Sequence, residues 1–186
     1  MMRFAIVLAG LLFGSAMATA APERTAYNFS FTAIEGHHLP LSDYQGRVLL
    51  VVNTASRCGF TDQYDALQAV WDRYRDKGLV VLGVPSNDFG GQEPGTEAEI
   101  KDFCEVNFGI DFPMTRKQPV KGSDAHPFYT WVVDHFGSVA APRWNFHKYL
   151  IGRDGRPIHW FPSPTSPTSK RMTNAIESAL ATAPRQ

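Results

Sequence analysis

The sequence predicts a three-layer α/β sandwich built around a mixed β-sheet. Two apolar runs, residues 48–52 and 79–85, are continuous rather than alternating, which is typical of strands covered on both faces. A stretch with helical spacing lies between them, and this strand–helix–strand order indicates a parallel pair of strands. Because a further strand, a hairpin and more helices follow, the sheet should also contain antiparallel strands.

The first half of the chain contains a hairpin and then the strand–helix–strand unit. The segment "NFSFTAIEGHHLPL" predicts a β-hairpin with Glu35-Gly36 as its turn. The helix between the apolar runs is expected to end at Gly78. Its inner face is predicted by four large side chains at helical spacing: Tyr64, Leu67, Trp71 and Tyr74.

A second helix and a further strand are predicted beyond the second apolar run. Thr96 and Glu99 form a capping-box pattern, which indicates the first turn of a helix. The inner face of this helix should carry Ile100, Phe103 and Cys104. The segment "FPMTRK" then predicts a strand.

The last third predicts a helix, a hairpin and a final helix. The helix is expected near residues 125–136, and "KYLIGRDGRPIHWF" predicts a hairpin around Asp154-Gly155. Pro167 is expected in the first turn of the final helix, because proline is tolerated there. Met172, Ile176 and Leu180 should face the core.

The N-terminus is typical of a secretory signal. Residues 1–20 combine a short positive end, an apolar run at 5–13 and a small-x-small motif at 18–20. A membrane anchor is the alternative, but the apolar run is shorter than the ~20 residues that span a bilayer. We therefore expect a signal peptide at 1–20, no membrane span after cleavage, and a periplasmic domain at 21–186.

Charge and cysteine content narrow the possible functions. Lys+Arg and Asp+Glu are equal at 18 each and form no block of one sign, so no nucleic-acid surface is predicted. The chain has 2 cysteines, too few for a fold held by disulfides. Core packing must stabilise the domain, and the thiols are available for chemistry. The six histidines lack HxxxH or HExxH spacing, so no metal site is predicted.

Cys58 lies where α/β proteins place reactive groups. It follows the carboxyl end of the first apolar run and precedes the first predicted helix, in the loop "NTASRCGFT". A helix N-terminus stabilises a thiolate over a thiol. An inert buried cysteine is the alternative, but Arg57 and Gly59 place Cys58 in a loop and not on an apolar face.

Two other segments offer hydrogen-bond donors for such a thiolate. "VPSNDFGGQEPG" is a Gly-rich loop that presents Gln92, and "PRWNFHKYL" places Trp144 next to Asn145. Taken alone, Trp144 is expected to be a core aromatic residue and Gln92 a loop residue. The local chemistry therefore identifies only a candidate thiol site.

Several separated motifs, in order, resemble the glutathione peroxidase family. They are "NTASRCGFTDQYDAL", "GVPSNDFGGQEPGTEAEIKDFC", "FGIDFPM", "AHPFYTWV" and "RWNFHKYLIGRDGRPIHWFPSPTSP". The resemblance spans nearly all of residues 27–182 and implies a thioredoxin-like fold with an N-terminal β-hairpin extension. It implies that Cys58 is the peroxidatic residue, with Gln92, Trp144 and Asn145 as its catalytic partners.

The resemblance also implies a reaction and a reductant. The Cys58 thiolate would reduce hydrogen peroxide or an organic hydroperoxide and become a sulfenic acid. No bound cofactor is implied; the co-substrate would be glutathione or a thioredoxin-like protein, and the role a defence against oxidative stress. The short "HFGSVAAPRWNF" segment favours a monomer, because the tetrameric members carry a longer loop there.

Three questions stay open from the sequence. Cys104 lies in the segment where many cysteine-type members carry a resolving cysteine, although its position beside Phe103 favours a buried core residue. A periplasmic thiol–disulfide oxidoreductase is an alternative function, but Thr61 stands where its second cysteine would be. A non-catalytic transport-accessory protein on the same scaffold is another.

Overall fold

A four-stranded mixed sheet forms the middle layer of the structure, a computed structural model in which residues 23–183 are described. The strand order is β4-β3-β5-β6. β3 (Val48–Thr54) pairs in parallel with β4 (Leu79–Pro85) and antiparallel with β5 (Lys148–Ile151). β5 also pairs antiparallel with β6 (Pro157–Phe161). The predicted mixed sheet with a parallel β3–β4 pair is therefore confirmed.

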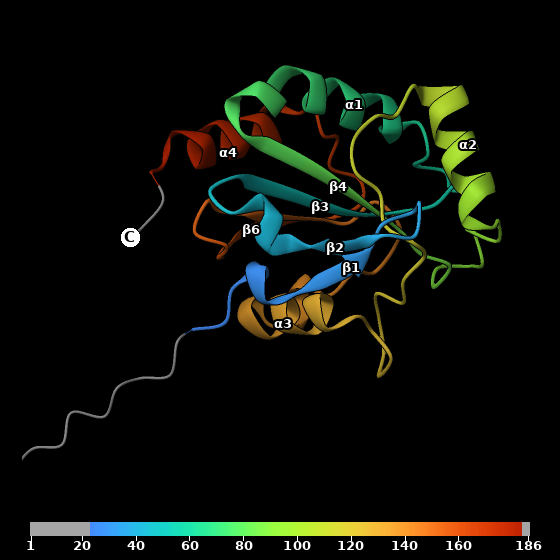
Figure 1. Ribbon diagram of the computed structural model, residues 1–186, viewed down its shortest axis with the longest axis horizontal. Coiled ribbons are helices and arrows are strands. Elements are labelled where there is room, and N and C mark those ends of the chain that lie inside the picture. Colours follow the sequence, from blue (N-terminus) through green and yellow to red (C-terminus); the bar gives the residue numbers. More distant parts are fainter. Residues whose placement is uncertain (1–22, 184–186) are drawn as a thin grey trace, which may run out of the picture.

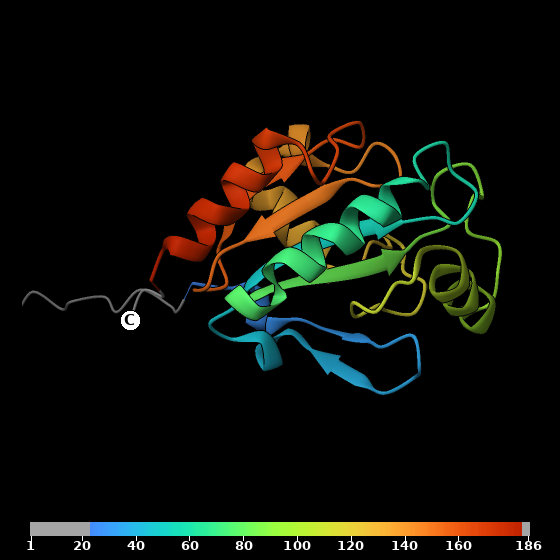
Figure 2. The same ribbon diagram turned by 90° about the horizontal axis from the view of Figure 1, so that it is seen from above.

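Helices cover both faces of this sheet (Figure 1). α1 (Gln63–Tyr74) and α4 (Lys170–Ala181) lie on one face, and α3 (Pro127–Phe136) lies on the other. α2 (Glu97–Phe108) stands beyond the carboxyl end of β4, as Figure 2 also shows. This arrangement is the three-layer sandwich that the order of sequence signals predicts.

The N-terminal hairpin forms a separate two-stranded sheet on the α3 side. β1 (Ser30–Thr32) and β2 (His38–Pro40) are antiparallel and turn at the predicted Gly36, whose φ is 101°. Within residues 23–183, four short 3-10 turns complete the secondary structure: η1 (Ala26–Asn28), η2 (Leu41–Tyr44), η3 (Arg75–Lys77) and η4 (Ser138–Ala140).

β3 is fully buried because it supplies two cores. Val48, Leu50 and Val52 belong to the core that contains the inner side chains of α1, α2 and α4. Leu49 and Val51 belong to the core shared with α3 and the N-terminal hairpin. A strand that packs on both faces must be apolar at every position, which explains the continuous apolar run in the sequence.

The local signals fix most helix boundaries. Gly78 follows α1 and η3 in the left-handed conformation, with φ 100°. At the start of α2, the Thr96 hydroxyl accepts from Glu99 N–H and the Glu99 carboxylate accepts from Thr96 N–H, which is the predicted capping box. The hairpin turn at Asp154-Gly155 is also present, and Gly155 has φ 77°.

Two expected elements differ in the structure. The segment "FPMTRK" forms only isolated bridges, from Met114 to Gly83 and from Thr115 to Ala33. Pro113 has no N–H to donate to a β-sheet ladder, and the residues after it bond alternately to β4 and to the hairpin. Pro167 lies in a turn before the last helix. α4 begins only at Lys170, where the Ser169 hydroxyl caps it by accepting from Met172 N–H.

The expected signal peptide at residues 1–20 lies outside the described residues. Between residues 23 and 183, no helix has the length and apolar character that crossing a membrane requires.

Candidate active site

Three loops meet beyond the carboxyl ends of β3 and β4 (Figure 2). The loop that carries Cys58 is bound to the Gly-rich loop by Arg57 N–H, which donates to the Gln92 carbonyl at 3.1 Å. The Gly-rich loop is bound to the segment before β5 by Asn145 Nδ2, which donates to Gln92 Oε1 at 2.9 Å. The structure therefore brings Gln92 and Asn145 together beside the Cys58 loop.

Cys58 is held in a tight turn. Its side chain is 9% exposed, and the Phe60 N–H donates to Cys58 Sγ at 3.4 Å. A donated hydrogen bond stabilises negative charge on sulfur. α1 begins only at Gln63, so the sulfur is contacted by an N–H of this turn and not by the first turn of the helix.

Thr61 fixes the shape of this turn. Its hydroxyl accepts from Cys58 N–H at 3.0 Å and donates to the Ala55 carbonyl at 3.0 Å. The sequence identified Thr61 only as the residue that replaces a second cysteine. In the structure it closes the turn around Cys58, a role that a thiol, as a weak donor and acceptor, would perform less well.

Asn53, which the sequence analysis missed, positions the Trp144–Asn145 pair. Its Nδ2 donates to the Trp144 carbonyl at 3.1 Å, and its Oδ1 accepts from His147 N–H at 3.1 Å. Between these contacts, Phe146 adopts a positive φ of 62° and donates its N–H to the Asn53 carbonyl at 2.6 Å. Such backbone strain in a non-glycine residue persists only where the surroundings impose it.

Trp144 lies at the edge of the site. Its side chain is 39% exposed, so the expectation of a core aromatic residue is wrong. The Trp144 ring lies 6.0 Å from that of Phe89, centroid to centroid, above the Gly-rich loop. A Cβ on Gly90 would lie 3.8 Å from the Trp144 ring, and Gly90 has φ 65°, so this glycine allows the loop to turn beneath the indole.

Glu93 is a second residue that the sequence analysis missed. It is 1% exposed, and within the described residues its Oε2 atom has no hydrogen-bond partner. Burial raises the pKa of Glu93, while the adjacent Ser56 and the charge of Lys117 oppose this shift. A buried carboxyl next to the Cys58 loop has no signal in a sequence, because a loop lacks periodicity.

Cys104 is separated from solvent. Its side chain is 1% exposed on the inner face of α2, and both cysteines are free. Burial raises the pKa of the Cys104 thiol to about 11; the nearby Tyr64 hydroxyl opposes this increase, and the charge of Glu93 adds to it. The neutral thiol is therefore the form present near pH 7.

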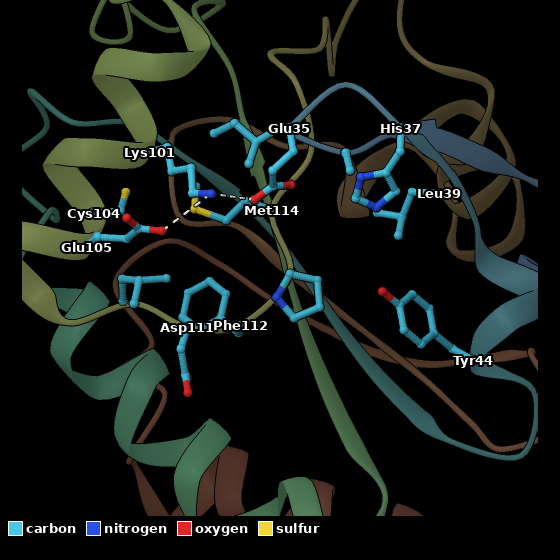
Figure 3. A pocket seen from close by; sticks show the side chains of 14 residues that line it. Glu35, His37, Leu39, Tyr44, Lys101, Cys104, Glu105, Asp111, Phe112 and Met114 are labelled. Atoms are coloured by element: carbon cyan, nitrogen blue, oxygen red, sulfur yellow. Dashed lines mark ion pairs between the residues drawn. The ribbon is translucent and has the colours of Figure 1, made fainter.

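A pocket of about 330 Å³ lies on the hairpin side of α2, and Cys104 belongs to its wall. Figure 3 shows Lys101 facing Glu35 and Glu105 across its rim. Lys101 Nζ lies 2.9 Å from Glu35 Oε1 and 3.6 Å from Glu105 Oε1. The pair with Glu35 connects α2 to the N-terminal hairpin, and the pair with Glu105 lies within α2.

The histidines do not assemble into a metal site. Over residues 23–183, no cluster of three or more His, Cys, Asp or Glu side chains has the geometry to hold a metal ion. His147 is 3% exposed, and burial, followed by the charge of Lys148, lowers its pKa to about 4.

Known proteins resemble this chain over most of its length. The family model described as "Glutathione peroxidase" matches residues 26–133. A hydroperoxy fatty acid reductase of Synechocystis sp. is 43% identical over 157 residues, which cover 80% of this chain and 93% of the relative. A glutathione peroxidase of Lactococcus lactis is 43% identical over 156 residues, which cover 83% of this chain and 98% of the relative.

Solved structures establish the fold class. Trgpx in its apo form is similar with a TM-score of 0.71 and 34% identity, covering 87% of this chain and 99% of that chain. A thioredoxin-family thiol:disulfide interchange protein of Chlorobium tepidum has a TM-score of 0.63 at 16% identity, covering 88% and 100%. The second likeness concerns the fold alone, and together the two confirm the expected thioredoxin-like fold.

Proposed function

We propose that this chain, which belongs to the glutathione peroxidase family and is a thiol peroxidase, uses Cys58 as the nucleophile that attacks the hydroperoxide. The observation that carries this assignment is the hydrogen bond from Phe60 N–H to Cys58 Sγ, in a loop at the carboxyl end of β3. This contact places a hydrogen-bond donor against the sulfur that attacks the hydroperoxide.

The reaction consumes one hydroperoxide and two thiols. The Cys58 thiolate attacks the terminal oxygen of ROOH, the O–O bond breaks, and the departing alkoxide takes a proton to become an alcohol, or water from hydrogen peroxide. A first thiol attacks the resulting sulfenic acid, releases water and forms a disulfide with Cys58. A second thiol attacks this disulfide, restores the Cys58 thiol and leaves as the oxidised disulfide.

Gln92, Asn145 and Trp144 are the donors for this chemistry. Because Gln92 uses Oε1 to accept from Asn145, its amide Nε2 is left to donate. The Trp144 indole N–H and the Asn145 amide are the further donors that can face a charged oxygen or sulfur. Such donors stabilise charge that develops on the leaving oxygen.

The reductant is a thiol, either glutathione or a thioredoxin-like protein. With α2 closed as in the structure, Cys104 is buried and mostly protonated, so it is not positioned to attack the Cys58 sulfenic acid. A disulfide between the two cysteines needs Cα atoms within about 7 Å and side chains that face each other. Because Cys104 lies on the buried face of α2, we expect that α2 would have to move before this bond forms. An external thiol reaches Cys58 without this step.

The protein is exported and acts as a periplasmic monomer. Support comes from the signal-like residues 1–20 and from the short segment before "WNF". N-terminal sequencing of the exported protein should find Ala21, and a chain that still begins at Met1 would contradict export with cleavage. Light scattering should give the monomer mass, and a stable tetramer at micromolar concentration would contradict it.

One assay tests the function against its alternatives. Hydrogen peroxide and cumene hydroperoxide are offered to the protein with glutathione or with thioredoxin and its reductase, and insulin reduction is measured in parallel. We expect hydroperoxide consumption with at least one donor and no insulin reduction above the thiol background. Insulin reduction without peroxide consumption would favour a thiol–disulfide oxidoreductase, and no activity in either assay would favour a non-catalytic protein.

A further inference from the structure

The Gly-rich loop that presents Gln92 has little conformational preference of its own. Gly90 and Gly91 are consecutive, and both adopt positive φ angles, 65° and 64°. Glycine adopts this conformation without strain, but it also loses more conformational freedom on folding than any other residue. Contacts from other side chains and segments must therefore fix the direction in which Gln92 points.

Three successive backbone groups, beginning at the Gln92 carbonyl, are each held by a different residue. The Gln92 carbonyl accepts from Arg57 N–H at 3.1 Å. The Glu93 N–H donates to Asn87 Oδ1 at 2.9 Å. The Glu93 carbonyl accepts from Lys117 Nζ at 3.0 Å. Lys117 therefore holds the backbone directly after Gln92.

The Lys117 ammonium group bridges two carbonyls of the loop. Besides the Glu93 carbonyl, Nζ donates to the Gly95 carbonyl at 2.6 Å. Hydrogen bonds from a charged donor are roughly twice as strong as those between neutral groups. Of the ion pairs formed within residues 23–183, none includes Lys117. The hydrogen bonds of this ammonium group are therefore made to the loop backbone.

The segment that carries Lys117 is itself fixed to the sheet. On one side of Lys117, the Thr115 N–H donates to the Gly83 carbonyl of β4 at 2.9 Å. On the other side, the Gln118 N–H donates to the Pro85 carbonyl at the end of β4, also at 2.9 Å. Because its backbone is held at both flanks, the lysine couples the position of β4 to that of the Gly-rich loop.

From these contacts we infer that Lys117 is a positioning residue for catalysis, which holds the Gly-rich loop so that the Gln92 amide faces the reacting group at Cys58. The inference rests on the proposed function, because Gln92 acts as a donor in that reaction. Gln92 Oε1 accepts from Asn145 Nδ2, so a loop that shifts disturbs this bond together with the direction of the Gln92 Nε2 group.

The expected size of the effect follows from the contacts that remain without the lysine. A displacement of about 1 Å can cost on the order of 10²-fold in rate. The bonds from Arg57 and to Asn87 still restrain the loop, so we expect only part of this loss, about tenfold in kcat/KM.

Hydrogen exchange tests whether Lys117 holds the loop, without any turnover. Lys117→Met removes the charge and the donors, and the variant should fold because the sites of both contacts are part-buried and water can replace the ammonium group. Amides in peptides that cover residues 88–95 should exchange faster than in the wild-type protein, and those of α4 should not change. Lys170→Met, at an exposed position on α4, is the matched control. Unchanged exchange in the loop, or equal acceleration by both substitutions, would overturn the inference.

A double-mutant cycle tests whether Lys117 acts through Gln92. Values of kcat/KM for hydrogen peroxide are measured for the wild-type protein, Lys117→Met, Gln92→Ala and the double variant. Lys117→Met should lower kcat/KM about tenfold in the wild-type background and less than about twofold in the Gln92→Ala background, where no amide is left to position. Lys170→Met should leave kcat/KM unchanged in both.

The outcomes separate this inference from the proposed function. If the wild-type protein turns over hydrogen peroxide, a Lys117→Met protein with wild-type kcat/KM, or an equal loss in both backgrounds, refutes the positioning role alone. An equal loss would mean that the lysine has a general structural role. Absence of hydroperoxide turnover by the wild-type protein refutes the peroxidase assignment and this inference together.

Discussion

Replacing Asn53 by alanine should reduce both stability and catalysis, because one side chain holds the whole segment that presents Trp144 and Asn145. Asn53 is fully buried, and its amide bonds the Trp144 carbonyl and the His147 N–H. Alanine leaves both backbone groups without these partners. The buried His147 N–H costs about 1–3 kcal/mol, and the part-buried Trp144 carbonyl about 0.5–1.5 kcal/mol. The free energy of unfolding should therefore fall by roughly 1.5–4.5 kcal/mol.

The catalytic effect follows from the positive φ of Phe146, which lies between the two residues whose backbone the Asn53 side chain holds. When that residue relaxes, Asn145 should move away from Gln92, and a displacement of about 1 Å can cost on the order of 10²-fold in rate. Urea unfolding measures the first effect, and kcat/KM in low denaturant, where the variant stays folded, measures the second. Asn174→Ala on the exposed side of α4 is the matched control. An Asn53→Ala protein with wild-type stability and wild-type kcat/KM would refute the reasoning.

Three further outcomes are expected. Gln92→Ala and Trp144→Phe should each lower kcat/KM by roughly 10²-fold without abolishing it, because the remaining donors still stabilise the leaving oxygen; complete loss in a folded variant would contradict shared donation. Iodoacetamide at pH 7 should modify Cys58 well before Cys104, because the Cys104 thiol is buried and has a pKa of about 11. Peptide mass mapping measures the two rates of modification. Equal rates would contradict this expectation and show that α2 opens readily. The stability should fall as the pH drops from about 6.5 to 4, by up to roughly 3 kcal/mol from His147 alone, because this side chain binds a proton in the unfolded chain but not in the folded one. Urea midpoints of the wild-type and His147→Phe proteins across this range test the sign, and an identical pH dependence in both would contradict it.

The sheet and helices were predictable because burial imposes periodicity on the sequence. β3 is apolar at five successive positions because its two faces pack against two cores. α1 repeats its large residues at helical spacing because only one face of the helix packs against a core. The segment "FPMTRK" carried a similar local signal, but its pairing depends on partners in β4 and the hairpin, far away in the sequence. A local pattern cannot report such competition.

The site was predictable in part. Cys58 is identified by its position after a buried strand, while Gln92 and Asn145 were assigned by family resemblance and prove to be hydrogen-bonded to each other. Asn53 was missed because its two bonded partners lie 91 and 94 residues further along the chain. Glu93 was missed because burial in a loop has no sequence signature.

A single-turnover experiment tests the assignment of Cys58 most directly. One equivalent of hydrogen peroxide is mixed with the reduced protein in the absence of any thiol, and residual peroxide and intact protein mass are measured over time. Wild-type and Cys104→Ser proteins should both consume the peroxide, and each should gain one oxygen atom at Cys58. The wild-type protein should lose this oxygen only if Cys58 and Cys104 then form a disulfide in a slower step. Cys58→Ser should consume none above the buffer background. Peroxide consumption by Cys58→Ser at the wild-type rate would contradict the account.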